Sequence, residues 1–555
     1  MSATSTTRHH RRSRLRRVLL ENLTAYLFLL PAALLIVIFG LFPVMFAFFV
    51  SLYRWRRFPD EYIGLGNYQR AMGDLVYIVF FWAAIAALIA GIVLLWRFVQ
   101  QTRSHPNKVN GLLVFGAAVI NSAAIFQFVR WFALLLPVVL DIPRRLRGQE
   151  RTQGLFVNEL FSSFGTPGVA EAGTLTLVIV IAAIAATVLL LRRILLENSG
   201  LLWRSTGSLL LLLLGGLTMQ LTLDSINAAI ETARAAGTEL PVWSQIIIIS
   251  AGFGLLGVAY WLWQHALRQS SDRRLLLGGL GALVIMVGGY ILIAELPRMV
   301  ASADRFLVDG FSVTVMYAVG AVPFQLAIGL GLAYLLFQNL KGKTFFRMVF
   351  FLPYIMPFLA TALVFKLLFS HREDSIINQI VGAVGVTPQK WLLEPLAIGN
   401  LIFGSEFPQG LAGPSLALVV VIIFSIWTYA GYDTVVFLAG LGNIPGELYE
   451  AARIDGASGW AIFRNLTLPL LSPTTFFLSL VAVIGTFQAF TQLWLMRSPA
   501  ARNTMDTVSI YIFKTITDAN VNYGYGSALA FVLFAVILLL TLFQNRLAGR
   551  RVFYG

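Results

Sequence analysis

The chain has 555 residues, of which 58% are hydrophobic and only 12% are charged. A soluble globular protein carries about 25% charged residues, so this composition excludes an ordinary soluble domain and indicates a protein that crosses a membrane many times. Cysteine is absent and the five histidines are scattered, so we expect neither disulfides nor a metal site.

About 20 consecutive apolar residues are needed for a helix to cross a bilayer, and about twelve stretches of the sequence meet this requirement. We therefore predict an all-α, polytopic membrane protein. The predicted spans lie at 25–52, 75–99, 111–139, 174–192, 207–223, 244–264, 275–295, 311–337, 345–370, 414–440, 473–496 and 526–545.

The first 20 residues form a basic tail that includes RHHRRSRLRR. The apolar run behind this tail is too long for a signal peptide, so we predict a retained cytoplasmic anchor. With the N-terminus inside, most Lys and Arg clusters fall on cytoplasmic loops and the C-terminus is also cytoplasmic, as the positive-inside rule requires. The same rule accounts for the net charge of +15, and nucleic acid is not an expected partner.

One loop disagrees with this orientation. Residues 140–152 carry four arginines, yet they fall on the outside. Either this amphipathic segment lies on the membrane surface, or the span count is wrong within 111–152.

A polar block at 444–473 separates two long apolar runs and reads IPGELYEAARIDGASGWAIFRNLTLPLLSP. Glu450, Ala451 and Ala452 are helix formers, whereas Asp455 and Gly456 form a turn-type break. A second amphipathic piece follows and stops at a proline. The block is therefore predicted to form two short helices that meet at a corner on the membrane surface.

This order of residues resembles the coupling loop of ABC importer permeases, and IPGELY with the Asp-Gly-Ala corner resembles the sugar-importer branch. The phrase YIGLGNYQRAM after the first span is also similar to that branch, and the resemblance is nearly continuous from Phe306 to the last span. The intervening spans do not resemble the family. We therefore predict a first core span and its loop at 21–72, an inserted transmembrane block at 73–300, and the rest of the permease core at 301–555.

The resemblance implies a type I importer permease core of six spans, here with about six inserted spans, in a multi-pass protein of the cell membrane. It also implies a sugar or oligosaccharide as the substrate. The implied partners are a second homologous permease subunit, two ABC ATPase subunits, an extracytoplasmic substrate-binding protein and membrane lipid. The chain itself lacks the phosphate-binding pattern G-x-x-x-x-G-K-[ST], so it is not expected to be an enzyme or to hold a cofactor. ATP and Mg²⁺ are expected to bind to the partner ATPase.

Residue roles also follow from the resemblance. Glu450, at the expected start of the coupling helix, would meet a basic groove in the ATPase. The small Ala451 and Ala452 would let the helix sit deep in that groove, and Asp455 with Gly456 would form the corner.

For the substrate pathway the sequence offers Gln488 and Gln492 in the span after the loop, where their i, i+4 spacing would place them on one helix face. Thr486 in the same span and Tyr432 in the preceding span are further candidates. Trp427, Tyr429 and Asp433 are weaker ones, and Asp433 is expected near the cytoplasmic interface. The alternative for both glutamines is that they hydrogen-bond neighbouring helices.

Two other functions compete with a sugar permease. A lipid-linked glycosyltransferase would need an acidic site in a sizeable loop, but the long loops at 371–413 and 497–525 contain no D-x-D pair. A secondary transporter would need charged residues near mid-membrane and inverted repeats, and neither is evident. The polar block favours the importer permease over both.

Overall fold

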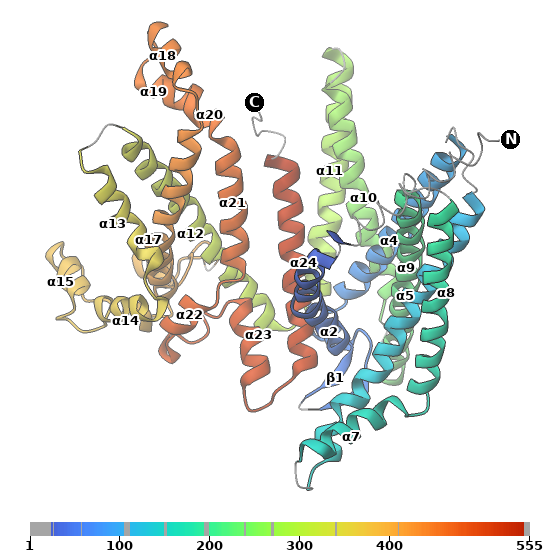
Figure 1. Cartoon of the computed structure of the whole chain (residues 1–555). Coiled ribbons are helices and arrows are strands. Elements are labelled where there is room, and N and C mark those ends of the chain that lie inside the picture. The colour runs from blue at the N-terminus through green and yellow to red at the C-terminus, as the bar shows by residue number, and fades with distance from the viewer. Residues whose placement is uncertain are drawn as a thin grey trace. The chain divides into compact units, whose positions relative to one another are not determined.

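The computed structural model describes residues 24–25, 27–56, 58–104, 111–148, 152–193, 199–237, 240–267, 271–338, 341–408 and 410–548. Within these residues the chain is almost entirely helical, which confirms the all-α prediction (Figure 1). Ten helices of the described part are long and apolar enough to cross a membrane, and two bent helix pairs raise this number to twelve. The count agrees with the about twelve predicted spans.

The chain forms two compact units. The first comprises the described residues up to Gln69, Leu75–Glu295 and Asn522–Ala528, and the second comprises Arg70–Asp74, Leu296–Val521 and the described residues from Leu529 onward. The domain limits at 21–72, 73–300 and 301–555 stay predictions. The basic tail at 1–20 lies outside the described residues.

The first unit is built mainly from long apolar helices, and it also holds a short hairpin that follows the first span. The hairpin pairs β1 with β2 in antiparallel fashion. Its elements, of which α3 and α11 also give residues to the second unit, are η1 (Ile36–Leu41), α2 (Phe42–Ser51), β1 (Tyr53–Trp55), β2 (Pro59–Tyr62), α3 (Gly66–Met72), α4 (Leu75–Ser104), α5 (Gly111–Leu140), α6 (Ile142–Arg145), α7 (Gln153–Phe164), α8 (Val169–Arg193), α9 (Ser199–Ala235), α10 (Val242–Ala266) and α11 (Ser271–Val300).

Glycines allow helices α4 and α9 to pack closely against each other. A Cβ atom at Gly91 would lie 2.8 Å from the Leu212 side chain, and one at Gly215 would lie 2.8 Å from the Leu88 side chain. Ser208 Oγ also donates a hydrogen bond to the Gly91 carbonyl at 2.8 Å. Small residues and interhelical hydrogen bonds are the usual means by which membrane helices pack closely, because apolar burial alone gives little driving force in lipid.

The arginine-rich loop that disagreed with the predicted orientation is followed by an amphipathic helix. Arg145 lies 3.0 Å from Glu159 of α7, so the loop and the helix are joined by an ion pair. Phe156, Phe161 and Phe164 of α7 are exposed. A helix that is polar on one side and exposes aromatic rings on the other is typical of a segment at a membrane surface. For residues 140–152 themselves, both explanations stay predictions.

The second unit contains the helices on both sides of the polar block. Its elements, of which α24 also gives residues to the first unit, are α12 (Arg305–Phe337), α13 (Lys343–Ile355), α14 (Phe358–Leu368), α15 (Ile376–Ala383), η3 (Trp391–Leu393), α16 (Ile398–Phe403), α17 (Leu416–Gly442), α18 (Gly446–Ile454), α19 (Gly459–Ile462), η4 (Phe463–Thr467), α20 (Leu468–Leu470), α21 (Ser472–Phe487), α22 (Thr491–Met496), η5 (Pro499–Ala501), α23 (Val508–Thr517) and α24 (Tyr523–Ala548).

Helix α17 is the centre of this unit, and glycines again allow its closest contacts. A Cβ atom at Gly329 of α12 would lie 2.7 Å from Asp433 Cβ, and one at Gly431 would lie 1.8 Å from the Phe350 carbonyl oxygen of α13. Both distances are shorter than real Cβ contacts, so only glycine permits this approach. The close approach brings polar residues of three helices around one cavity, described below.

Two predicted spans are not single helices. The span at 345–370 is bent by 94° between α13 and α14. Met356 takes an extended conformation there because the residue before a proline avoids the helical region. The span at 473–496 stops at Phe487 and restarts at Thr491. The hydroxyl groups of Ser509 and Thr507 donate hydrogen bonds to the Phe487 and Ala489 carbonyls, at 3.3 and 3.4 Å, and so satisfy backbone groups at the break.

Candidate functional site

The polar block forms the predicted pair of short helices with a corner. Helix α18 ends at Ile454, and Gly456 has φ +76°, a conformation that glycine adopts without strain. The Ala457 amide donates to the Ala452 carbonyl at 3.0 Å and the Gly456 amide to the Arg453 carbonyl at 3.1 Å. This is the hydrogen-bond pattern of a Schellman C-cap, so the corner is encoded locally.

The position of Glu450 in α18 differs from the prediction. The helix begins at Gly446 with Pro445 before it, and the acidic residue of its first turn is Glu447. Glu450 therefore lies in the middle of the helix, and the expected contribution of its charge to the helix N-terminus is wrong. The prediction placed the start at the first strong helix formers and did not use Pro445, although a proline is a usual signal for a helix start.

The residues of this corner are largely exposed. Helix α18 has no buried residue, and Ile454 and Trp460 are 86% and 69% exposed. A contact joins the two sides of the corner: Tyr449 Oη of α18 and Thr467 Oγ1 of η4 lie 3.3 Å apart. Glu450, Ala451, Asp455 and Gly456 are exposed and Ala452 is half-buried. The block thus presents a rigid corner whose outer face nothing in the described residues covers.

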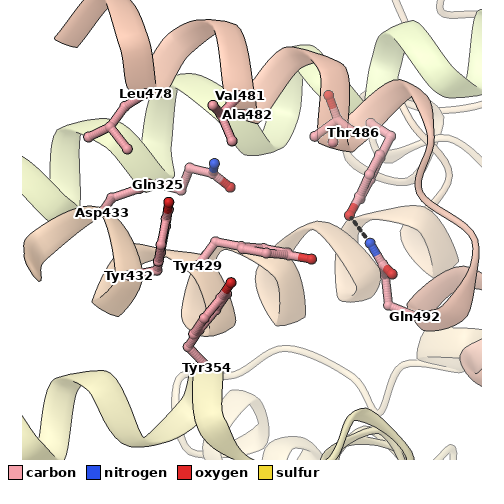
Figure 2. Close-up of a pocket in the computed structure, with 12 residues that line it drawn as sticks. Gln325, Tyr354, Tyr429, Tyr432, Asp433, Leu478, Val481, Ala482, Thr486 and Gln492 are labelled. Atoms are coloured by element: carbon pink, nitrogen blue, oxygen red, sulfur yellow. Dashed lines mark hydrogen bonds between the residues drawn. The ribbon is translucent and has the colours of Figure 1, made fainter. Parts of the chain in front are cut away.

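The second unit also contains a cavity of about 140 Å³, shown in Figure 2. It lies between α12, α13, α17, α21 and α22. The lining is mainly aromatic and polar, and consists of Tyr317, Gln325, Tyr354, Tyr429, Tyr432, Asp433, Leu478, Val481, Ala482, Gly485, Thr486 and Gln492.

One hydrogen-bond network fixes part of this lining. Gln492 Nε2 donates to Tyr317 Oη at 3.0 Å, the dashed line in Figure 2. Tyr317 Oη in turn lies 2.5 Å from Ser425 Oγ. All three residues are buried. A buried polar network that is satisfied in this way holds α12, α17 and α22 in one arrangement.

Aromatic rings form another side of the cavity. The ring of Tyr354 stacks on that of Tyr432 with centroids 4.9 Å apart, and it meets Tyr429 edge-on at 6.0 Å. Their hydroxyl groups and ring faces are the two kinds of surface that a sugar contacts, because a sugar ring has both hydroxyl groups and an apolar face.

The structure brings together three of the four predicted pathway residues: Tyr432, Thr486 and Gln492 all line the cavity. Gln488 is exposed and is not part of the lining. Because the helix breaks between Gln488 and Gln492, the two glutamines do not share a helix face, and this part of the prediction is wrong. Asp433 is buried in the lining, and its expected place near the cytoplasmic interface stays a prediction.

Three polar lining residues were not anticipated: Tyr317, Gln325 and Tyr354. The first two lie in the apolar run of α12, eight residues apart, so they fall close to one helix face. This spacing of two polar residues in an apolar run is the sequence feature from which they could have been predicted.

Comparisons with known proteins identify a matching family model and several relatives. A family model described as "Binding-protein-dependent transport system inner membrane component" matches residues 325–553. The chain is 31% identical to the arabinooligosaccharides transport system permease protein AraP of Bacillus subtilis (strain 168), over 41% of this chain and 65% of AraP. The chain therefore spans slightly less than two thirds of the length of AraP.

The chain is also 31% identical to the probable ABC transporter permease protein YesP of the same organism, over 46% of this chain and 76% of YesP. A crystal structure of a bacterial alginate ABC transporter, in complex with its pentasaccharide-bound periplasmic protein, has a TM-score of 0.39 and 21% identity and covers 45% of this chain and 81% of its own. On the identity and coverage of YesP, the chain belongs to the family of inner-membrane permease components of binding-protein-dependent ABC transport systems.

Proposed function

We propose that the chain is the permease subunit of an ABC importer that moves a sugar or oligosaccharide into the cell. The observation that carries this proposal is the exposed α18–α19 corner, a rigid polar strut joined to a helix of the cavity. Helix α21, which follows the corner, contributes Thr486 to the lining. A movement of the corner is thus transmitted directly to the wall of the cavity.

The corner would receive the ATPase. Its outer face carries the Glu450 carboxylate, which makes no ion pair with any described residue. A basic groove on the ATPase would pair with this charge, and the small side chains of Ala451 and Ala452 would allow close contact. ATP and Mg²⁺ bind to two such ATPase subunits in this proposal, and the permease itself does no covalent chemistry.

The cavity would receive the substrate. AraP is named for arabinooligosaccharides, and we extend to this chain the carbohydrate class rather than the individual sugar. The tyrosine rings would stack on sugar faces, while Gln492 and Thr486 would exchange hydrogen bonds with hydroxyl groups. A second homologous permease subunit and an extracytoplasmic binding protein would complete the importer in the lipid bilayer, with both termini of this chain in the cytoplasm.

The glycosyltransferase alternative has no comparable support, since neither the family model nor the relatives described above belong to such enzymes. Genes next to this one provide a quick check. A second, shorter permease gene with its own coupling loop, beside a gene for a secreted binding protein, supports the importer, whereas their absence counts against it.

The direct test is the charge reversal Glu450→Lys in the importer reconstituted with its partner subunits. We expect normal membrane insertion but loss of ATP hydrolysis that depends on substrate and binding protein, because the added cation would face a basic groove. Glu171→Lys, an exposed charge reversal in the first turn of α8, is the matched control and should retain coupled hydrolysis. Coupled hydrolysis at the wild-type rate in Glu450→Lys would refute this role of the corner.

A further inference from the structure

Asp433 is the most unusual residue of the cavity. Its side chain is 2% exposed, and its Oδ2 atom has no hydrogen-bond partner among the described residues. The neighbouring lining residue Gln325 is 4% exposed, and its Oε1 atom also has no partner there. Because burying a charge or an acceptor without a partner is costly, two such oxygens at one cavity need an explanation.

The packing around Asp433 offers no cation. On the α12 side it meets Gly329, where a Cβ atom would lie only 2.7 Å from Asp433 Cβ. Among the described residues, the cavity lining has one carboxylate and contains no lysine, arginine or histidine. The carboxyl group of Asp433 therefore has no neighbouring base of this unit to pair with.

Gln325 Oε1 is an acceptor, as is Asp433 Oδ2 when the carboxyl group is ionised, and a ligand that satisfies both must bring hydrogen-bond donors. Sugar hydroxyl groups and amino groups are such donors, whereas a carboxylate or a phosphate is not. A negatively charged group placed in this cavity would also lie close to a buried carboxylate, where repulsion is strong because the surroundings have a low dielectric constant.

We propose that Asp433 and Gln325 form an acceptor site that selects carbohydrates without negative charge. Hydroxyl or amino groups of the substrate donate to Asp433 Oδ2 and Gln325 Oε1, and uronic acids and sugar phosphates are excluded by the carboxylate. This inference rests on the proposed function, because it assigns a substrate class to the same cavity. Figure 2 shows both residues beside Tyr432, whose ring would hold the apolar face of the same sugar.

The test measures sugar binding to the assembled importer in lipid nanodiscs. The binding protein is left out, so that its own choice of sugar does not contribute to the measured selectivity. The probes are cellobiose, lactose and maltotriose, each beside its 6-uronate. For the wild type we expect at least one neutral probe to bind, and its uronate to bind about ten-fold more weakly or worse, because the uronate places a second negative charge in a cavity of low dielectric constant. In Asp433→Asn this difference should shrink to about three-fold or less, since the amide keeps the shape and loses the charge.

Asp374→Asn is the matched control, because Asp374 is exposed and does not line the cavity; it should keep the wild-type discrimination. If Asp433→Asn does not give a folded complex, Gln325→Leu provides the second test. It removes one acceptor and keeps the charge, so it should weaken neutral probes several-fold and leave the rejection of uronates intact.

Equal binding of neutral probes and uronates by the wild type would overturn this inference and leave the proposed function standing. Unchanged discrimination in Asp433→Asn would also overturn it. If none of the probes, neutral or acidic, binds to the wild type, both the inference and the proposed function are contradicted.

Discussion

The contact between Gly431 and Phe350 gives the sharpest structural test. A Cβ atom at Gly431 would lie 1.8 Å from the Phe350 carbonyl oxygen and 3.2 Å from the Phe351 Cα atom. Real Cβ contacts are essentially never shorter than 3.0 Å, so Gly431→Ala must move the α13 backbone by about 1.2 Å or more. Overpacking of this kind costs about 1–3 kcal/mol.

The displacement would also reach the cavity. Tyr354 lies on α13 and stacks on Tyr432 of α17 with ring centroids 4.9 Å apart, so moving α13 separates the two rings. We expect Gly431→Ala to lower the melting temperature of the purified protein and to weaken sugar binding. Both are measured on one preparation, by thermal unfolding in detergent and by equilibrium binding.

Gly442→Ala is the control for this experiment. Gly442 is the last residue of the same helix, and nothing lies within 4 Å of a Cβ atom placed there. Alanine is the better helix former by about 1 kcal/mol in a helix interior, so this variant should melt at or slightly above the wild-type temperature. A Gly431→Ala protein with wild-type melting temperature and binding would refute the packing argument.

Four further predictions concern other residues of the chain. Gln492→Leu removes the hydrogen bond to Tyr317, so it should lower stability by about 1 kcal/mol and raise the half-saturating sugar concentration several-fold; a lowered melting temperature with unchanged half-saturation would instead assign Gln492 to helix packing alone. Gln488→Leu, at an exposed position, should leave the melting temperature unchanged. Single cysteines placed on the inserted helices within 75–295, in a chain that has no native cysteine, should be labelled equally with and without substrate, whereas protection at several positions would place these helices in the pathway. Gly456→Ala forces a left-handed backbone conformation on alanine at a cost of about 1–2 kcal/mol, so coupled ATP hydrolysis should fall while sugar binding is kept; unchanged coupling would show that the corner tolerates the strain.

Local chemistry explains what the sequence could predict. The corner at Asp455 and Gly456 depends on a turn dipeptide and a Schellman C-cap, both of which lie within a few residues of each other. The number of spans depends on the lengths of apolar runs, which are also local. These features could be read without knowing which helices pack together.

The features that the sequence could not predict depend on contacts between distant segments. The break after Phe487 is satisfied by hydroxyl groups of Thr507 and Ser509, some 20 residues away along the chain. Tyr317 and Ser425 are 108 residues apart, yet their hydroxyl groups lie in hydrogen-bond contact. Residue periodicity holds no information on such pairs, and for this reason the cavity was predicted only in part.

The central claim is that this chain is the membrane part of an ATP-driven sugar importer. Its most direct test is uptake of a labelled neutral oligosaccharide into vesicles that contain this chain, a second permease, the ATPase subunits and the binding protein. We expect the sugar to accumulate above its outside concentration only when ATP and the binding protein are both present, and we expect Glu450→Lys to abolish this accumulation. Accumulation without ATP, or full accumulation by the Glu450→Lys importer, would contradict the account.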